Sequence, residues 1–143
     1  MGLLTAFVVA DVAQAARVGA ATRPVESFGG WASKWLHALE LEALWDAIDP
    51  THDRREVALG PLLYARREDG PWVTEVNPAL ITRLAALDVV DLPRLAERGA
   101  EQLQDANGND YTAGDIAVVL RRLREVAQRA RSDGRALLHW ASL

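Results

Sequence analysis

The feature that most constrains the fold of this chain is a long amphipathic segment near its C-terminal end, residues 113–132. Apolar side chains recur there at helical spacing and form one continuous stripe: Ile116, Val119, Leu120, Leu123, Val126, Ala127 and Ala130. A stripe of this width must be covered by an apolar surface elsewhere in the fold. Thr112 and Asp115 form a capping-box pattern before it, and Gly134 suits the end of a helix. The sequence therefore predicts a long helix with one face packed on a core.

Short apolar runs at both ends of the chain predict two strands of one sheet. They are Leu3–Ala10 and Ala136–Ser142, and both have the length of a strand. Alternation places Leu138 and Trp140 on one face of the second strand and His139 on the other. We expect the face of Trp140 to meet the stripe of the long helix, which would bury the indole.

The segments between these ends alternate between strand and helix patterns. In chain order they predict a helix over residues 12–19, a strand over 31–35, a helix over 38–49, a β-hairpin over 61–76, and helices beginning near residues 78 and 92. The hairpin turn is Asp69-Gly70, and Pro71 after it predicts a loop somewhat longer than two residues. The order β-α-β-α-β-β-α-α-α-β is not a regular alternation. It predicts an α+β fold with a mixed or antiparallel sheet of about five strands and helices packed mainly on one face.

Composition narrows the class of protein. A chain of 143 residues, half of them apolar and a quarter charged, predicts a single globular domain over residues 1–143. Cysteine is absent, which excludes disulfides, thiolate metal sites and cysteine nucleophiles and suits a reducing compartment. The net charge of −4 argues against a dedicated nucleic-acid binder, because such proteins need a basic surface.

The opening residues resemble an export signal in one respect only. Ala-Gln-Ala at residues 13–15 could be a cleavage site, but no Lys or Arg precedes Arg17. The apolar run Leu3–Ala10 is also far shorter than a membrane span. We therefore expect a strand followed by a helix in a cytoplasmic protein that neither crosses nor binds a membrane.

No catalytic or metal-binding motif stands out. The three histidines, His37, His52 and His139, have no second ligand at metal spacing, and the phosphate-binding glycine motifs and the nucleophile-elbow motif are absent. We expect His37 to cap a helix and His52 to lie in a surface loop. The carboxylates expected on the solvated side of the 38–49 helix are Glu40, Glu42 and Asp46. The sequence thus predicts no metal and no cofactor, and it assigns no catalytic residue.

Tryptophan is unusually frequent in this chain, with five residues. Trp31 and Trp35 are expected on the same face of one strand, where they could bind a ligand or a partner protein. The alternative is that the five indoles simply fill the core.

Arginine is concentrated on the long helix. Arg121, Arg124 and Arg131 are expected to form one exposed strip away from the apolar stripe. Such a strip could contact an acidic partner, or it could be ordinary cation enrichment near a helix C-terminus.

Four stretches, "MGLLTAFVVAD", "FGG", "EDGPWVTEV" and "GRALLHWASL", resemble a group of short uncharacterised bacterial proteins and, more distantly, the YfbM-like proteins. The resemblance runs nearly end to end. Its motifs are short and apolar, so it implies a shared fold, and it implies no activity and no site residues.

Two functional hypotheses remain at this point. The first is a non-enzymatic protein that binds a macromolecular partner or acts as a regulatory module. The second is a small-molecule-binding protein, or an enzyme, with a tryptophan-lined pocket. An apolar cavity of several hundred Å³ with convergent polar groups would favour the second hypothesis.

Overall fold

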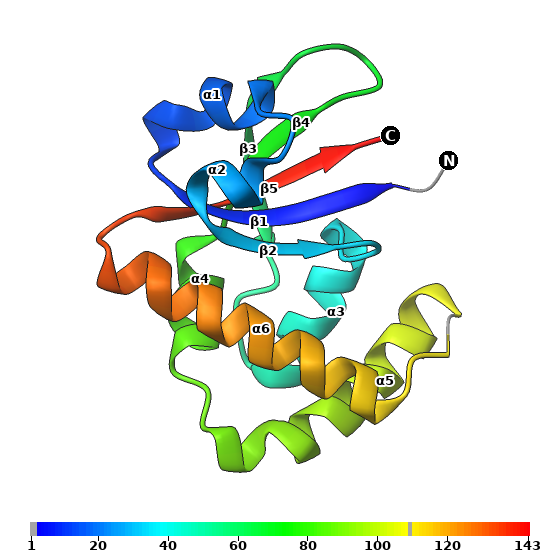
Figure 1. Cartoon of the computed structure of the whole chain (residues 1–143). Coiled ribbons are helices and arrows are strands. Elements are labelled where there is room, and N and C mark those ends of the chain that lie inside the picture. Colours follow the sequence, from blue (N-terminus) through cyan, green and yellow to red (C-terminus); the bar gives the residue numbers. More distant parts are fainter. Residues whose placement is uncertain (1–2, 109) are drawn as a thin grey trace.

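The first and last strands of the chain lie side by side in the middle of one antiparallel sheet (Figure 1). The computed structural model describes residues 3–108 and 110–143. Within these residues the sheet has five strands in the order β2-β1-β5-β4-β3, and every neighbouring pair is antiparallel. The strands are β1 (Leu4–Ala10), β2 (Gly30–Ser33), β3 (Leu59–Ala65), β4 (Trp72–Val76) and β5 (Ala136–Ser142). The α+β class predicted from the sequence is confirmed.

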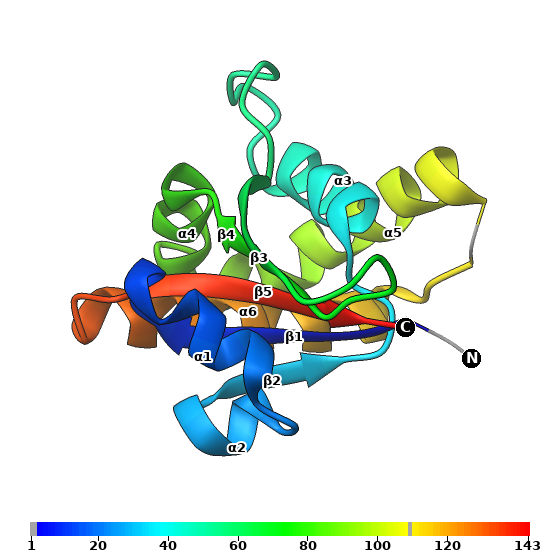
Figure 2. The same ribbon diagram turned by 90° about the horizontal axis from the view of Figure 1, so that it is seen from above.

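The helices are divided unequally between the two faces of the sheet (Figure 2). In the described residues, the larger ones lie on one face: α3 (Ala38–Ile48), α4 (Pro78–Ala85), α5 (Leu92–Asn107) and α6 (Ala113–Ser132). The other face carries two short ones, α1 (Ala15–Ala20) and α2 (Pro24–Phe28). The predicted order of elements and the packing of helices mainly on one face are confirmed. The helix predicted over residues 12–19 is a 3-10 turn (Val12–Gln14) followed by α1, and the short helix α2 was not predicted.

The long helix α6 follows its sequence pattern closely. It begins at the predicted capping box, in which the Asp115 N–H donates to Thr112 Oγ1 at 3.0 Å and the Thr112 N–H donates to Asp115 Oδ2 at 3.2 Å. All seven residues of its apolar stripe are buried. They share one core with Phe7 and Val9 of β1 and Leu137 of β5. The helix ends before Gly134, whose φ of 65° is the left-handed conformation expected there.

The prediction for the face of Trp140 is wrong. Leu138 and Trp140 lie on the side of the sheet covered by α1 and α2, where they pack with Ala6, Val8 and Val73. The α6 stripe instead meets the face of Leu137, and Trp140 is half-buried. The reason is that β5 is a central strand covered on both faces, so its alternation does not reveal which face meets the larger helices.

Two local predictions can be compared with the strands directly. The predicted strand over residues 31–35 ends earlier, at Ser33, so Trp35 lies after the strand and not within it. The β3–β4 connection is longer than two residues, as Pro71 predicted, and the Arg66 N–H donates to the Pro71 carbonyl at 3.2 Å across it. Within the described residues, the helices are all too short or too polar to span a bilayer.

Candidate functional site

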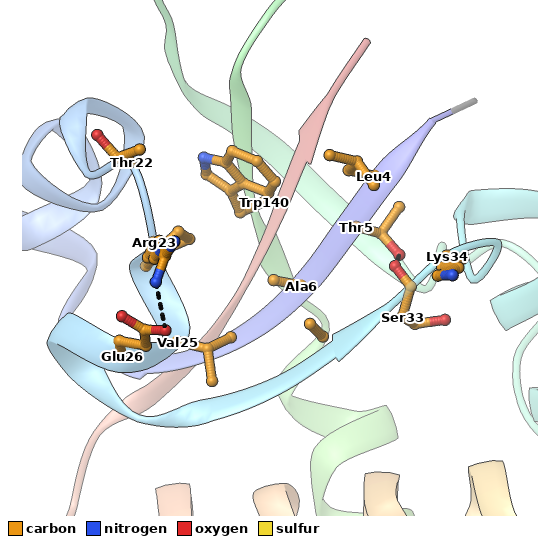
Figure 3. Close-up of a pocket in the computed structure, with 12 residues that line it drawn as sticks. Leu4, Thr5, Ala6, Thr22, Arg23, Val25, Glu26, Ser33, Lys34 and Trp140 are labelled. Carbon is orange, nitrogen blue, oxygen red and sulfur yellow. Dashed lines mark hydrogen bonds and ion pairs between the residues drawn. The ribbon is translucent and has the colours of Figure 1, made fainter. Parts of the chain in front are cut away.

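A cavity of about 470 Å³ opens between α2 and the sheet, on the face that the short helices cover only partly (Figure 3). It is called the Trp140 pocket here. Its walls come from β1, β2, β5, the helix α2 and the segment that leads into this helix. The residues that line it are Leu4, Thr5, Ala6, Thr22, Arg23, Pro24, Val25, Glu26, Ala32, Ser33, Lys34 and Trp140.

The register of the sheet explains why there is space at this point. Ala6 of β1 pairs with Trp140 of β5 on one side and with Ala32 of β2 on the other. These three side chains therefore stand in one row on the same face of the sheet. The indole of Trp140 extends far above the sheet, whereas the two alanine side chains are short. The methyl groups of the alanines therefore form the floor of the cavity, and the indole ring forms a wall beside it.

The indole N–H of Trp140 makes no hydrogen bond within the described residues. Its Nε1 atom is buried, and no hydrogen-bond acceptor for it exists in the described part of the chain. A buried donor without a partner costs about 1–3 kcal/mol relative to a paired one. An acceptor on a bound molecule would remove that cost only where the groups that now cover Nε1 give way to it.

The rim of the Trp140 pocket is charged. Arg23 and Glu26 form an ion pair at 3.3 Å, and both side chains are well exposed. Lys34 lies at the other end of the pocket, beside the end of β2 (Figure 3). Between them, Thr5 Oγ1 donates to the Ser33 carbonyl at 2.8 Å and holds the end of β2 against β1. The apolar floor is thus bordered by two cations and one carboxylate.

Trp31 and Trp35, the tryptophans predicted as binding residues, lie on the other face of the sheet. They line one shallow cavity of about 500 Å³, together with Tyr111 and Asp115. The Trp35 and Tyr111 rings stack with their centroids 4.3 Å apart, and Trp31 stacks on Phe7 at 6.0 Å. Trp31 and Trp35 are both half-buried. The structure therefore brings these two tryptophans together in what we call the aromatic hollow.

The arginine strip is not a single exposed surface. Arg121 and Arg131 are exposed, as predicted. Arg124 is half-buried, and its Nε donates to the Leu87 carbonyl at 2.7 Å, so its predicted exposure is wrong. It bonds the main chain two residues beyond Ala85, the last residue of α4. This contact assigns a structural role to Arg124, and it could not be predicted without knowing where α4 ends.

The histidines are more buried than the sequence indicated. The predicted surface position of His52 is wrong, because its side chain is only 4% exposed, stacks on Trp45 and bonds Asp46 Oδ1 through Nε2 at 2.7 Å. His37 caps α3 as predicted, with Nδ1 accepting from the Ala38 N–H at 2.7 Å.

His139 is buried among the core residues. Burial lowers the pKa of its imidazole to about 4, against the opposing effect of its hydrogen bond to Leu36. Its Nε2 lies 3.0 Å from the Leu36 carbonyl, which can only accept, so the neutral ring carries its proton on Nε2. His139 also lines a cavity of about 360 Å³ with His37 and Thr74. No group of three metal-ligating side chains is present among residues 3–108 and 110–143.

Comparisons with protein families, with curated proteins and with solved structures gave no match to this chain. The class that the fold and site define is an α+β protein with a tryptophan-walled pocket on the thinly covered face of an antiparallel sheet. Sequence analysis missed this pocket because Ala6, Ala32 and Trp140 are brought together by strand register, which leaves no local pattern in the chain.

Proposed function

We propose that this protein binds a small molecule in the Trp140 pocket. The observation that supports this most directly is the buried indole N–H of Trp140, unpartnered within the described residues, on the wall of a cavity of about 470 Å³. Pockets for small ligands are mostly apolar, of about 300–1,000 Å³, with a few polar groups that orient the ligand. This combination favours the second of the two functional hypotheses.

The chemistry of the walls indicates the kind of ligand. A flat apolar body fits between the Trp140 ring and the methyl floor of Ala6 and Ala32. A hydrogen-bond acceptor on the ligand pairs with the indole N–H once the groups that cover Nε1 move aside, because this atom has almost no exposed surface. A carboxylate or sulfonate at the outer end of the ligand pairs with Lys34 or Arg23 at the rim. We propose binding of this molecule and no reaction on it, because the residues that line the pocket form no nucleophile–base pair.

Fluorescence titration with anilinonaphthalene sulfonate tests the proposal, since this probe has a flat apolar body and an anionic acceptor. Ala32→Leu places a larger side chain on the floor of the pocket and should weaken binding by about tenfold or more. Ala65→Leu changes an exposed alanine at the end of the opposite edge strand and should leave the dissociation constant unchanged. Equal binding by the two variants, or no binding by the wild-type protein, would overturn the proposal.

The hypothesis of a macromolecular partner is supported by a different observation, the open edge of the sheet at β2, and remains a separate proposal.

A further inference from the structure

The main-chain groups on the outer side of β2 have no strand to pair with. β2 is an edge of the sheet and pairs only with β1. The Val9 N–H donates to the Gly29 carbonyl at 3.1 Å, and the bonded pairs of an antiparallel ladder recur at every second residue. Trp31 and Ser33 therefore bond to β1, whereas the N–H and C=O of Ala32 point away from it. Because Ala32 is exposed, this donor and this acceptor face outward at an open edge.

The opposite edge of the sheet, β3, is built differently. Pro61 lies inside β3, and shifts of register between Leu59 and Tyr64 interrupt its pairing with β4. Proline and bulges are features that keep an edge strand from accepting another strand. β2 contains no proline, and its pairing with β1 is regular from Gly30 to Ser33. The sheet thus has one blocked edge and one open edge.

A cavity lies on each face of the sheet beside the open edge. Ala32, Ser33 and Lys34 line the Trp140 pocket on one face and also the aromatic hollow on the other. Successive side chains of a strand point to opposite faces of its sheet. A strand added beside β2 would therefore direct its side chains alternately into the two cavities.

We propose that β2 binds an extended segment of a partner protein, which joins the sheet as an additional strand. Its main chain pairs with the outward N–H and C=O of Ala32. One apolar side chain enters the Trp140 pocket, and the side chains before and after it pack on Trp31 and Trp35. The proposal rests on the open edge and holds whether or not the Trp140 pocket also takes a free small molecule.

Charge at the edge specifies the partner further. Lys34 is the only lysine of the chain, it is exposed, and no ion pair engages it in the part of the chain that the structure describes. It follows β2 directly and lies beside both cavities. A carboxylate in the partner segment, next to the apolar residues, would pair with it.

A second copy of this chain fits the edge poorly. In an antiparallel pair, residues directly opposite each other share a face of the sheet. The residues of β2 and its extension that share the face of the Trp140 pocket are Gly30, Ala32 and Lys34. None of them offers a large apolar side chain for a cavity of about 470 Å³. The geometry therefore favours a different protein with a bulky apolar residue at this position.

Synthetic peptides with a fluorescent label provide the test. Each is about eight residues long, with Leu, Phe or Val at alternating positions and one Asp, and binding is followed by fluorescence anisotropy. We expect at least one peptide to bind with a dissociation constant well below about 1 mM. N-methylation of the alternate amides that face β2 should abolish its binding, whereas methylation of the intervening amides should not. Failure of every peptide to bind, or an equal effect of the two methylation patterns, would overturn the proposal.

A protein variant tests the same pairing from the other side. Ala32→Pro removes the outward N–H without removing a bond to β1, so the sheet should persist, and peptide binding should weaken by about tenfold or more. Ala65→Ser, at the end of the opposite edge strand, leaves both cavities and the open edge unchanged and should bind like wild type. Circular dichroism checks that both variants are folded. If Ala32→Pro does not fold, the exchange rate of the Ala32 amide in the wild-type protein decides, since bound peptide should slow it and the sulfonate probe should not.

The two proposals fail in different ways. Trp35→Ala should weaken binding of the peptide and leave binding of the sulfonate probe unaffected, because Trp35 lines the aromatic hollow and is not among the residues that line the Trp140 pocket. A dimer of the wild-type chain in sedimentation analysis that Ala32→Pro converts to a monomer would overturn the choice of a foreign partner.

Discussion

Replacement of Arg124 by methionine is the substitution whose effect can be worked out most directly from the structure. Arg124→Met keeps the length and much of the apolar stem of the side chain, so little packing is lost. It removes the charged donor that bonds the Leu87 carbonyl at 2.7 Å. Leu87 is buried, so its carbonyl has little access to water as a replacement partner. We therefore expect the free energy of unfolding to fall.

The expected size of the loss follows from the kind of bond. A hydrogen bond to a charged group contributes about 1.5–3 kcal/mol, and the partial exposure of Arg124 reduces this to about 1–2 kcal/mol. For a chain of this length, such a loss lowers the melting temperature by about 3–6 °C. Arg121→Met, on the exposed part of the same helix, is the matched control and should change stability by less than about 0.5 kcal/mol. Urea and thermal unfolding of both variants measure the difference, and equal stabilities would refute the role assigned to Arg124.

Three further predictions concern other parts of the structure. The pKa of His139 is about 4 in the folded protein and about 6.5 in the unfolded chain, so folding favours the neutral imidazole. The resulting contribution to stability is fully present above about pH 6.5 and is lost as the pH falls to about 4. The total is about 3 kcal/mol, and urea unfolding of His139→Gln across this pH range should lack that component. A Cβ on Gly19 would overlap the Tyr64 ring, so Gly19→Ala should cost about 1–3 kcal/mol in the same assay, and an unchanged midpoint would contradict the packing of Tyr64. Trp140→Phe removes an unpartnered donor along with some apolar surface, so its stability should lie within about 1 kcal/mol of wild type, while binding of the sulfonate probe weakens severalfold.

The elements that could be predicted from the sequence are those that local sequence patterns determine. The stripe of α6, its capping box at Thr112 and its end at Gly134 depend on residues within a few positions of one another. The same holds for the strand predicted at Leu3–Ala10, which the structure places at Leu4–Ala10, and for the His37 cap. Apolar periodicity and helix capping involve residues within one or two helical turns, so they can be recognised in the sequence without knowledge of the tertiary structure.

The features that were missed depend on contacts between distant segments. Trp140 was placed on the wrong face because β5 is apolar on both sides, and Arg124 was expected in solvent although it reaches the chain after α4. His52 lies in a polar stretch that predicts a loop, yet the Trp45 ring covers it. In each case the decisive partner is supplied by tertiary packing, which a pattern along one segment does not contain.

The Trp140 indole N–H is the group on which the proposed function depends, and NMR can observe it directly. The protein has five tryptophans, so a nitrogen–proton correlation spectrum should contain five indole signals, and Trp140→Phe identifies the one that belongs to Trp140. We predict that adding the sulfonate probe moves this signal downfield, as expected for an N–H that gains an acceptor, while the signal of Trp45, buried in the other core, stays in place. If the probe binds and shifts the signals of Trp31 or Trp35 while that of Trp140 is unchanged, the Trp140 pocket is not the binding site.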